Sequence, residues 1–261
     1  MITLNYFDCI SPLPIELNGV GFIKSPQLID IAKISYLTYA AYIYHLRMTP
    51  EEYFEVYHKD ENIDFSFIFN LTKFDLVIND ESFRTIINSA LNFFLENSIE
   101  YYPEYEAFIS TREENGEKIA LGLINRDNYA EVIDIILQRV HITPDENEVD
   151  DIKKVKNKHG LKIYKKIMER RKKFKKAKAN NPDLTMANII ASVATRSNGL
   201  NWTNIWEITI FQLFDEFERL QISDQYNIAS IQVAAWGDKE KKFKVGLWSK
   251  NIYEKQENGT G

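Results

Sequence analysis

The sequence is poor in residues that cross-link or interrupt a chain. It contains a single cysteine, Cys9, so no intramolecular disulfide can form. Its 10 glycines and 7 prolines among 261 residues are too few for a collagen-like or disordered protein, and 44% of its residues are hydrophobic. The composition therefore predicts a folded protein, long enough for one large domain or two small ones.

Targeting and membrane-spanning segments are lacking as well. The start, Met1 to Leu4, has neither the basic nor the apolar region of a secretory signal. The longest aromatic and aliphatic run, Tyr36 to Leu46, is about half of the roughly 20 residues that cross a bilayer, and it contains His45. We therefore expect an intracellular, cytoplasmic protein that does not contact a membrane.

Motifs for catalysis, metals and cofactors are missing too. The four histidines fall in different segments without the spacing of zinc or di-iron ligands. Gly19-Val20-Gly21 lacks the third glycine of a dinucleotide fingerprint, and neither a phosphate-binding loop nor a nucleophile elbow occurs. Cys9 lies in an apolar run, which favours a buried side chain over a nucleophile. Clustered acids such as Asp215 to Glu218 are typical of a solvated helix face. The sequence predicts no catalytic residue, no metal, no cofactor and no enzyme.

The charge is strongly segregated along the chain. Residues 153–178 hold 14 of the 32 basic residues and one acid, which gives them a charge of about +13 and leaves about −19 for the remainder. Apolar residues from Leu161 to Phe174 recur on one stripe of a predicted helix that ends near Ala179. The expected contacts in this basic stripe are Lys165, Lys166, Arg170, Arg171, Lys172 and Lys173.

Three interpretations of the basic segment stay open: a solvated face, a site for an acidic protein surface, or a site for nucleic acid phosphates. Lysine outnumbers arginine in residues 153–178 by 12 to 2, which favours a solvated or electrostatically steering face over sequence-specific recognition of nucleic acid bases.

All four tryptophans lie in the last third of the chain. Tryptophans at this density are typical of a core, but tryptophan is also enriched at interface hot spots, and both interpretations stay open. The candidate partner-binding residues of this region are Trp202, Trp206, Trp236 and Trp248.

Local signals predict most of the secondary structure. An Asn-Gly pair indicates a hairpin over residues 14–23, and Ser25-Pro26 indicates the start of a helix that we expect to reach Met48. Residues 63–78 have a mixed period and allow no assignment. Thr49-Pro50-Glu51-Glu52 repeats this start signal before a helix to about Lys59, and apolar residues recur at intervals of three and four in a helix over 81–97. The further expected elements are a strand over 2–9, a helix through Val140 that is capped by Asn125 or Asp127, helices over 185–195, 203–220 and 226–236, and a second hairpin over 107–124.

These elements predict an α+β protein that is predominantly helical, with two small β-hairpins in its N-terminal part and a helical C-terminal part. The expected organisation is an α+β part over 1–143, a basic helical connector over 144–181, a helical part over 182–250 and a flexible tail over 251–261.

Several stretches resemble uncharacterised proteins encoded in the tail-morphogenesis region of phages and prophages of Gram-positive bacteria. The stretches that carry this resemblance are Ile10 to Ile15, Gly19 to Ile31, Ile208 to Phe217 and Ala235 to Asp238.

The resemblance implies a tail assembly chaperone, a non-enzymatic protein of the host cytoplasm that coats the long tape-measure protein during assembly. Broad apolar helix faces and opposite charge poles are compatible with binding a partner helix and with self-association. Two other functions remain open. One is a nucleic-acid-associated protein that uses residues 153–178, and the other is a structural component of the virion tail or connector.

Overall fold

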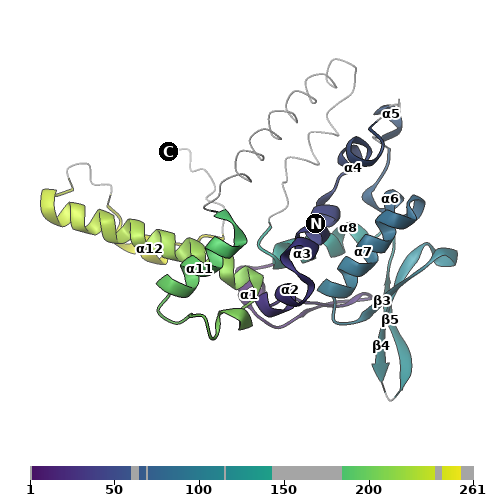
Figure 1. Ribbon diagram of the computed structural model, residues 1–261, viewed down its shortest axis with the longest axis horizontal. Coiled ribbons are helices and arrows are strands. Elements are labelled where there is room, and N and C mark those ends of the chain that lie inside the picture. The colour runs from purple at the N-terminus through teal and green to yellow at the C-terminus, as the bar shows by residue number, and fades with distance from the viewer. Residues whose placement is uncertain are drawn as a thin grey trace. The chain divides into compact units, whose positions relative to one another are not determined.

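The computed structural model describes residues 2–59, 65–68, 70–114, 116–142, 184–238 and 243–253. The chain divides into two compact units (Figure 1). The first unit contains residues 1–142 together with 206–211, and the second contains the rest of the chain. The six basic residues of the predicted stripe, the rest of the predicted basic connector and the end of the predicted tail lie outside the described residues.

The described elements confirm a helix-rich α+β fold. In chain order they are α1 (Tyr6–Ile10), β1 (Ile15–Leu17), β2 (Gly21–Ile23), α2 (Leu28–Ile34), α3 (Tyr36–Arg47), α4 (Pro50–Tyr57), α5 (Phe65–Ile68), α6 (Lys73–Asn79), α7 (Glu81–Phe94), β3 (Ser98–Tyr102), η1 (Pro103–Tyr105), β4 (Ala107–Glu114), β5 (Glu117–Ile124), α8 (Tyr129–Arg139), α11 (Met186–Arg196), η3 (Ile205–Glu207), α12 (Ile210–Trp236) and η4 (Val245–Ser249).

Helix α7 organises the core of the first unit. Its apolar residues recur at intervals of three and four, which places them on one face. The helix contacts α3, α6 and β3, and the carboxylate of Asp80 caps its N-terminus. The fully or almost fully buried residues of this face are Phe83, Ile87, Ala90, Leu91 and Phe94. Burial of each large apolar side chain on this face stabilises the fold by about 1.5–3 kcal/mol.

Strands β3, β4 and β5 form an antiparallel sheet in that order. On the outer edge of β3, the side chain of Asn92 of α7 satisfies both backbone groups of Ile99. It donates to the carbonyl (2.7 Å) and accepts from the N–H (2.9 Å). At the other edge, the N–H of Leu123 donates to the carbonyl of Gly19 in the β1–β2 turn (2.8 Å). The hairpin and the helix thus cover parts of both edges of the sheet.

A late segment of the chain completes the first unit. The N–H of Leu28 donates to the carbonyl of Ile208 (3.0 Å), and the N–H of Ile210 donates to the carbonyl of Pro26 (2.9 Å). Ile210 and Phe211 are almost fully buried. Residues 206–211 are therefore joined to the chain just before α2 by these two hydrogen bonds, on either side of an antiparallel bridge between Gln27 and Thr209.

Several expected elements are confirmed and several are wrong. The Asn-Gly hairpin is present as β1–β2, and α4 begins at Pro50 with Thr49 as its cap, as expected. The expected strand over 2–9 is instead the short helix α1, because the side chain of Asn5 accepts from the N–H of Asp8 (2.8 Å) and starts a helical turn. The second expected hairpin is β4–β5, and β3 adds a third strand to it.

The expected helix over 26–48 is divided in two. Ser35 adopts a left-handed φ of 75°, which ends α2 and begins α3. Ser25 does not cap α2, because its hydroxyl donates to the carbonyl of Arg139 (2.7 Å). Further along, the two helices expected over 203–220 and 226–236 form the single helix α12, which begins at Ile210 rather than at Thr203.

The second unit contains α11, η4 and most of α12. Helix α11 confirms the helix expected over 185–195. Thr185 caps it, and its last residue, Arg196, forms an ion pair with Asp224 of α12. Helix α12 is 27 residues long. Within the described parts of the chain, no helix is both long enough and apolar enough to cross a membrane.

Candidate functional site

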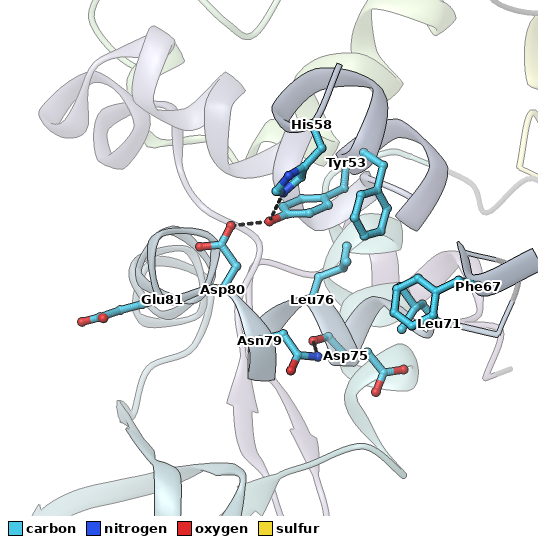
Figure 2. Close-up of a pocket in the computed structure, with 10 residues that line it drawn as sticks. Tyr53, His58, Phe67, Leu71, Asp75, Leu76, Asn79, Asp80 and Glu81 are labelled. Carbon is cyan, nitrogen blue, oxygen red and sulfur yellow. Dashed lines mark hydrogen bonds between the residues drawn. The ribbon is translucent and has the colours of Figure 1, made fainter. Parts of the chain in front are cut away.

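A cleft of about 470 Å³ opens between the helices of the first unit (Figure 2). Its walls come from α4, α5, α6 and the beginning of α7, together with the segments that join them. The lining is mainly apolar, and the volume lies within the range of ligand-binding pockets. The lining residues are Tyr53, Phe54, His58, Phe67, Leu71, Asp75, Leu76, Asn79, Asp80 and Glu81.

A chain of hydrogen bonds crosses one wall of the cleft (Figure 2). The hydroxyl of Tyr53 donates to Oδ2 of Asp80 (2.5 Å), so its oxygen accepts from Nε2 of His58 (3.3 Å). The other carboxylate oxygen of Asp80 accepts from the N–H groups of Ser82 (2.7 Å) and Phe83 (3.1 Å) at the start of α7. Both oxygens of Asp80 are therefore engaged in holding α4 and α7 together.

This arrangement keeps Asp80 ionised. Burial by itself would raise the pKa of Asp80, but the hydrogen bonds from Tyr53, Phe83 and Ser82 and the charge of His58 outweigh burial and lower the pKa below its ordinary value. A carboxylate with a lowered pKa is a poor general acid at neutral pH.

The second carboxylate of the cleft, Asp75, also has a structural role. Its Oδ2 accepts from the N–H (2.6 Å) and the hydroxyl (2.7 Å) of Thr72, which closes a capping box at the start of α6, and its Oδ1 pairs with Arg126. Burial raises the pKa of Asp75, but these hydrogen bonds and the positive charge of Arg126 lower it by more. The side chain of Glu81 points away from the cleft (Figure 2).

The geometry of the cleft suits binding better than proton transfer. Asp75 and Asp80 are ionised and hydrogen-bonded at helix N-termini, while most of the other lining residues are aromatic or aliphatic. Within the described residues, no group of three or more histidine, cysteine or acidic side chains is placed to hold a metal ion. A cleft of this kind can accept an apolar or aromatic side chain of another molecule.

The predicted tryptophan contacts lie at the surface of the protein. Trp202, Trp236 and Trp248 are each more than half exposed, and Trp206 is half-buried. A core role for these tryptophans is therefore wrong for the three exposed ones. Trp206 belongs to the first unit and the other three belong to the second, so the structure does not define one site that joins all four.

The cleft was not predicted from the sequence. Thr49 and Pro50 predict the start of α4, but α5 and most of α6 fall in the stretch over 63–78, whose mixed period allows no assignment. Thr72 and Asp75 form a capping box four residues long, which is the local signal that identifies the start of α6.

Comparison with known families gives a match for the C-terminal part of the chain. Residues 175–253 match the family model of the YomV second domain, and YomV is a protein of Bacillus phage and prophage regions. The match covers less than a third of the chain, so it describes one domain and not the whole protein. No curated protein and no solved structure matches the chain. The C-terminal part is thus similar to a phage-associated domain.

Proposed function

We propose that this protein is a non-enzymatic phage assembly factor, a tail assembly chaperone or adaptor that binds the tape-measure protein or another tail protein in the host cytoplasm. The observation that carries the proposal is the apolar cleft between α4, α5, α6 and α7, in which both aspartates are already engaged in helix capping. The similarity of residues 175–253 to a phage-associated domain supports the setting.

The cleft binds a partner by taking up apolar side chains from one face of a helix. Phe67 of α5 and Leu76 of α6 both line the cleft, and Phe67 is exposed whereas Leu76 is buried. An aromatic side chain that is exposed beside a concave apolar floor is the kind of group that contributes most to protein binding. A helical tail protein with apolar residues at intervals of three and four fits this recognition mode.

Co-expression with the tape-measure protein tests the proposal. We expect the intact protein to raise the soluble fraction of the tape-measure protein several-fold, and Phe67→Ser to abolish most of this effect because it removes an apolar contact at the mouth of the cleft. Tyr105→Ser is the matched control, since Tyr105 is also an exposed aromatic residue but lies on η1. The Tyr105→Ser variant should raise the soluble fraction of the tape-measure protein as much as the intact protein does.

The same experiment separates this proposal from the alternatives. Equal solubility of the tape-measure protein with and without the intact protein would refute the chaperone function. A gel shift with nucleic acid that weakens steeply with salt would instead favour the nucleic-acid-associated protein. Recovery of the chain from purified particles by mass spectrometry would favour a structural virion component.

A further inference from the structure

The C-terminal half of α12 is a helix surface without charge. From Gln225 to Trp236 the sequence contains no Lys, Arg, Asp or Glu, although this part of the helix is largely exposed. A solvent-exposed helix ordinarily carries charged residues on its outer face. Twelve uncharged residues in succession therefore indicate a surface that is covered in the functional state.

The exposed apolar residues of this half form one stripe. Ile228, Ile231 and Ala235 follow one another at intervals of three and four, so they lie on the same side of the helix, and Trp236 borders them. Ile228 is 58% exposed, Ile231 is 68% exposed and Trp236 is 74% exposed. We call these four residues the α12 stripe.

The neighbouring face of α12 already has a partner. Tyr226, Ala229 and Val233 are half-buried, and the ring of Tyr226 stacks on Phe243 with 5.6 Å between the ring centroids. The N–H of Phe243 also donates to the carboxylate of Asp238 (2.9 Å), which holds it near the end of α12. Phe243 thus covers Tyr226 on this face, while the α12 stripe stays exposed.

We propose that the α12 stripe pairs with the α12 stripe of a second copy of this chain, with the two helices antiparallel. The argument is charge matching. When two uncharged faces meet, no charged group has to give up its hydration, whereas a charged partner would bury its charges against the stripe without a counter-ion. In an antiparallel pair about a two-fold axis, Ile228 faces the small Ala235 of the second copy, and Ile231 lies next to the axis. Large and small side chains therefore alternate across the contact.

The length of the stripe limits the strength of the dimer. Twelve helical residues span about 18 Å, and a helix face of this length buries less than the roughly 800 Å² per partner of a stable interface. The dimer is therefore in exchange with the monomer, and its population rises with protein concentration. This inference concerns the second unit and does not depend on the cleft of the proposed function.

Sedimentation equilibrium of the full chain tests the pairing. The weight-average mass is expected to rise with concentration from 30.6 kDa, the mass of one chain, toward twice that value. Ile231→Glu places a charge at the axis and should hold the mass at one chain over the same range. Leu37→Glu is the matched control, because Leu37 is 81% exposed on α3 of the first unit. The Leu37→Glu variant should dimerise as the unchanged chain does.

Cross-linking then tests the geometry. Cys9 is the only cysteine of the chain and is buried, so Ile231→Cys introduces one exposed thiol. A short bismaleimide should link two Ile231→Cys chains near the axis and should link two Leu37→Cys chains at least ten-fold less. A mass that stays at 30.6 kDa at every concentration, an equal effect of the two glutamate variants, or equal cross-linking of the two cysteine variants would each overturn the inference.

Discussion

Arg139 is a fully buried charged side chain whose guanidinium is hydrogen-bonded to backbone carbonyls. Its guanidinium donates to the carbonyls of Asp8, Ser11 (3.0 Å) and Leu13 (2.7 Å). Burial lowers the pKa of Arg139 from its ordinary value. These carbonyls belong to the end of α1 and the segment that follows it, so one side chain from α8 fixes the N-terminal segment to the core.

Replacement of Arg139 by methionine should strongly destabilise the protein. The variant fills most of the volume but leaves several buried carbonyls without donors, and we expect the free energy of unfolding to fall by about 3 kcal/mol or more. Urea denaturation followed by circular dichroism measures the change. Arg112→Met, a substitution of an exposed arginine on β4, should change the free energy by less than about 0.5 kcal/mol. Equal effects of the two variants would contradict the role of Arg139.

Asp80 links the stability of the protein to pH. Because its pKa is lower in the folded protein than in the unfolded chain, its contribution is complete above the unfolded value of about 4 and is lost as the pH falls through the folded value. Asp80→Ala should lower the free energy of unfolding by about 1–2 kcal/mol at pH 7, the usual cost of losing a helix cap. The difference in the free energy of unfolding between Asp80→Ala and the unchanged protein should become smaller below pH 4, and urea denaturation at each pH measures it. A free-energy difference that stays constant down to pH 2 would show that ionisation of Asp80 does not contribute to stability.

At the scale of elements, the contact between the β1–β2 turn and β5 depends on a glycine. A Cβ atom added at Gly122 would lie 1.9 Å from the carbonyl oxygen of Gly19, and backbone atoms cannot move aside as a flexible side chain can. Gly122→Ala should therefore separate the hairpin from the sheet and lower the free energy of unfolding by about 1–3 kcal/mol.

Hydrogen exchange provides the specific measurement for this change. The N–H of Leu123, which donates to Gly19, should lose protection in Gly122→Ala, while amides in the middle of α7 should keep theirs. Gly199→Ala is the control, because a Cβ atom at Gly199 meets nothing within 4 Å. Unchanged protection of Leu123 in Gly122→Ala would show that the turn and the strand are not in close contact.

The sequence predicts elements best where the signal is local. The Asn-Gly turn of β1–β2, the capping box of α4 and the regular apolar spacing of α7 each lie within a few residues, and the structure confirms these elements. The break at Ser35 and the strand β3 are missing from the sequence prediction. Ser35 has a φ of 75°, which is uncommon for serine and has no residue pattern of its own, and β3 is held by its pairing with β4 and by the side chain of Asn92. Strand preference depends on such contacts more than on the residues of the strand itself.

The candidate site shows the same limit. The exposure of Trp236 could not be derived from its residue type, because tryptophan favours both cores and interfaces. The cleft needs four helices at defined angles, and one of them, α5, has only four residues. Its helical period is too short to be read from the sequence.

At the scale of the whole molecule, the first unit is discontinuous in sequence. A fragment of residues 1–142 lacks the segment 206–211, and with it the burial of Ile210 and Phe211. We expect this fragment to be less stable than a chain ending at residue 238 by about 3–6 kcal/mol, the sum for two large apolar side chains. Urea denaturation monitored by α-helical circular dichroism measures the difference. Equal unfolding midpoints for the helices of the first unit would contradict the prediction.

The pairing of residues 206–211 with the chain before α2 also determines when the first unit can be completed during synthesis. The ribosome adds 69 residues between Ile142 and Phe211, and at about 5–20 residues per second this takes roughly 3–14 s. During that interval the nascent N-terminal part lacks residues 206–211, and with them the burial of Ile210 and Phe211. The newly made chain therefore exposes apolar surface to chaperones and proteases for seconds, and slower translation of this stretch would lower the yield of folded protein.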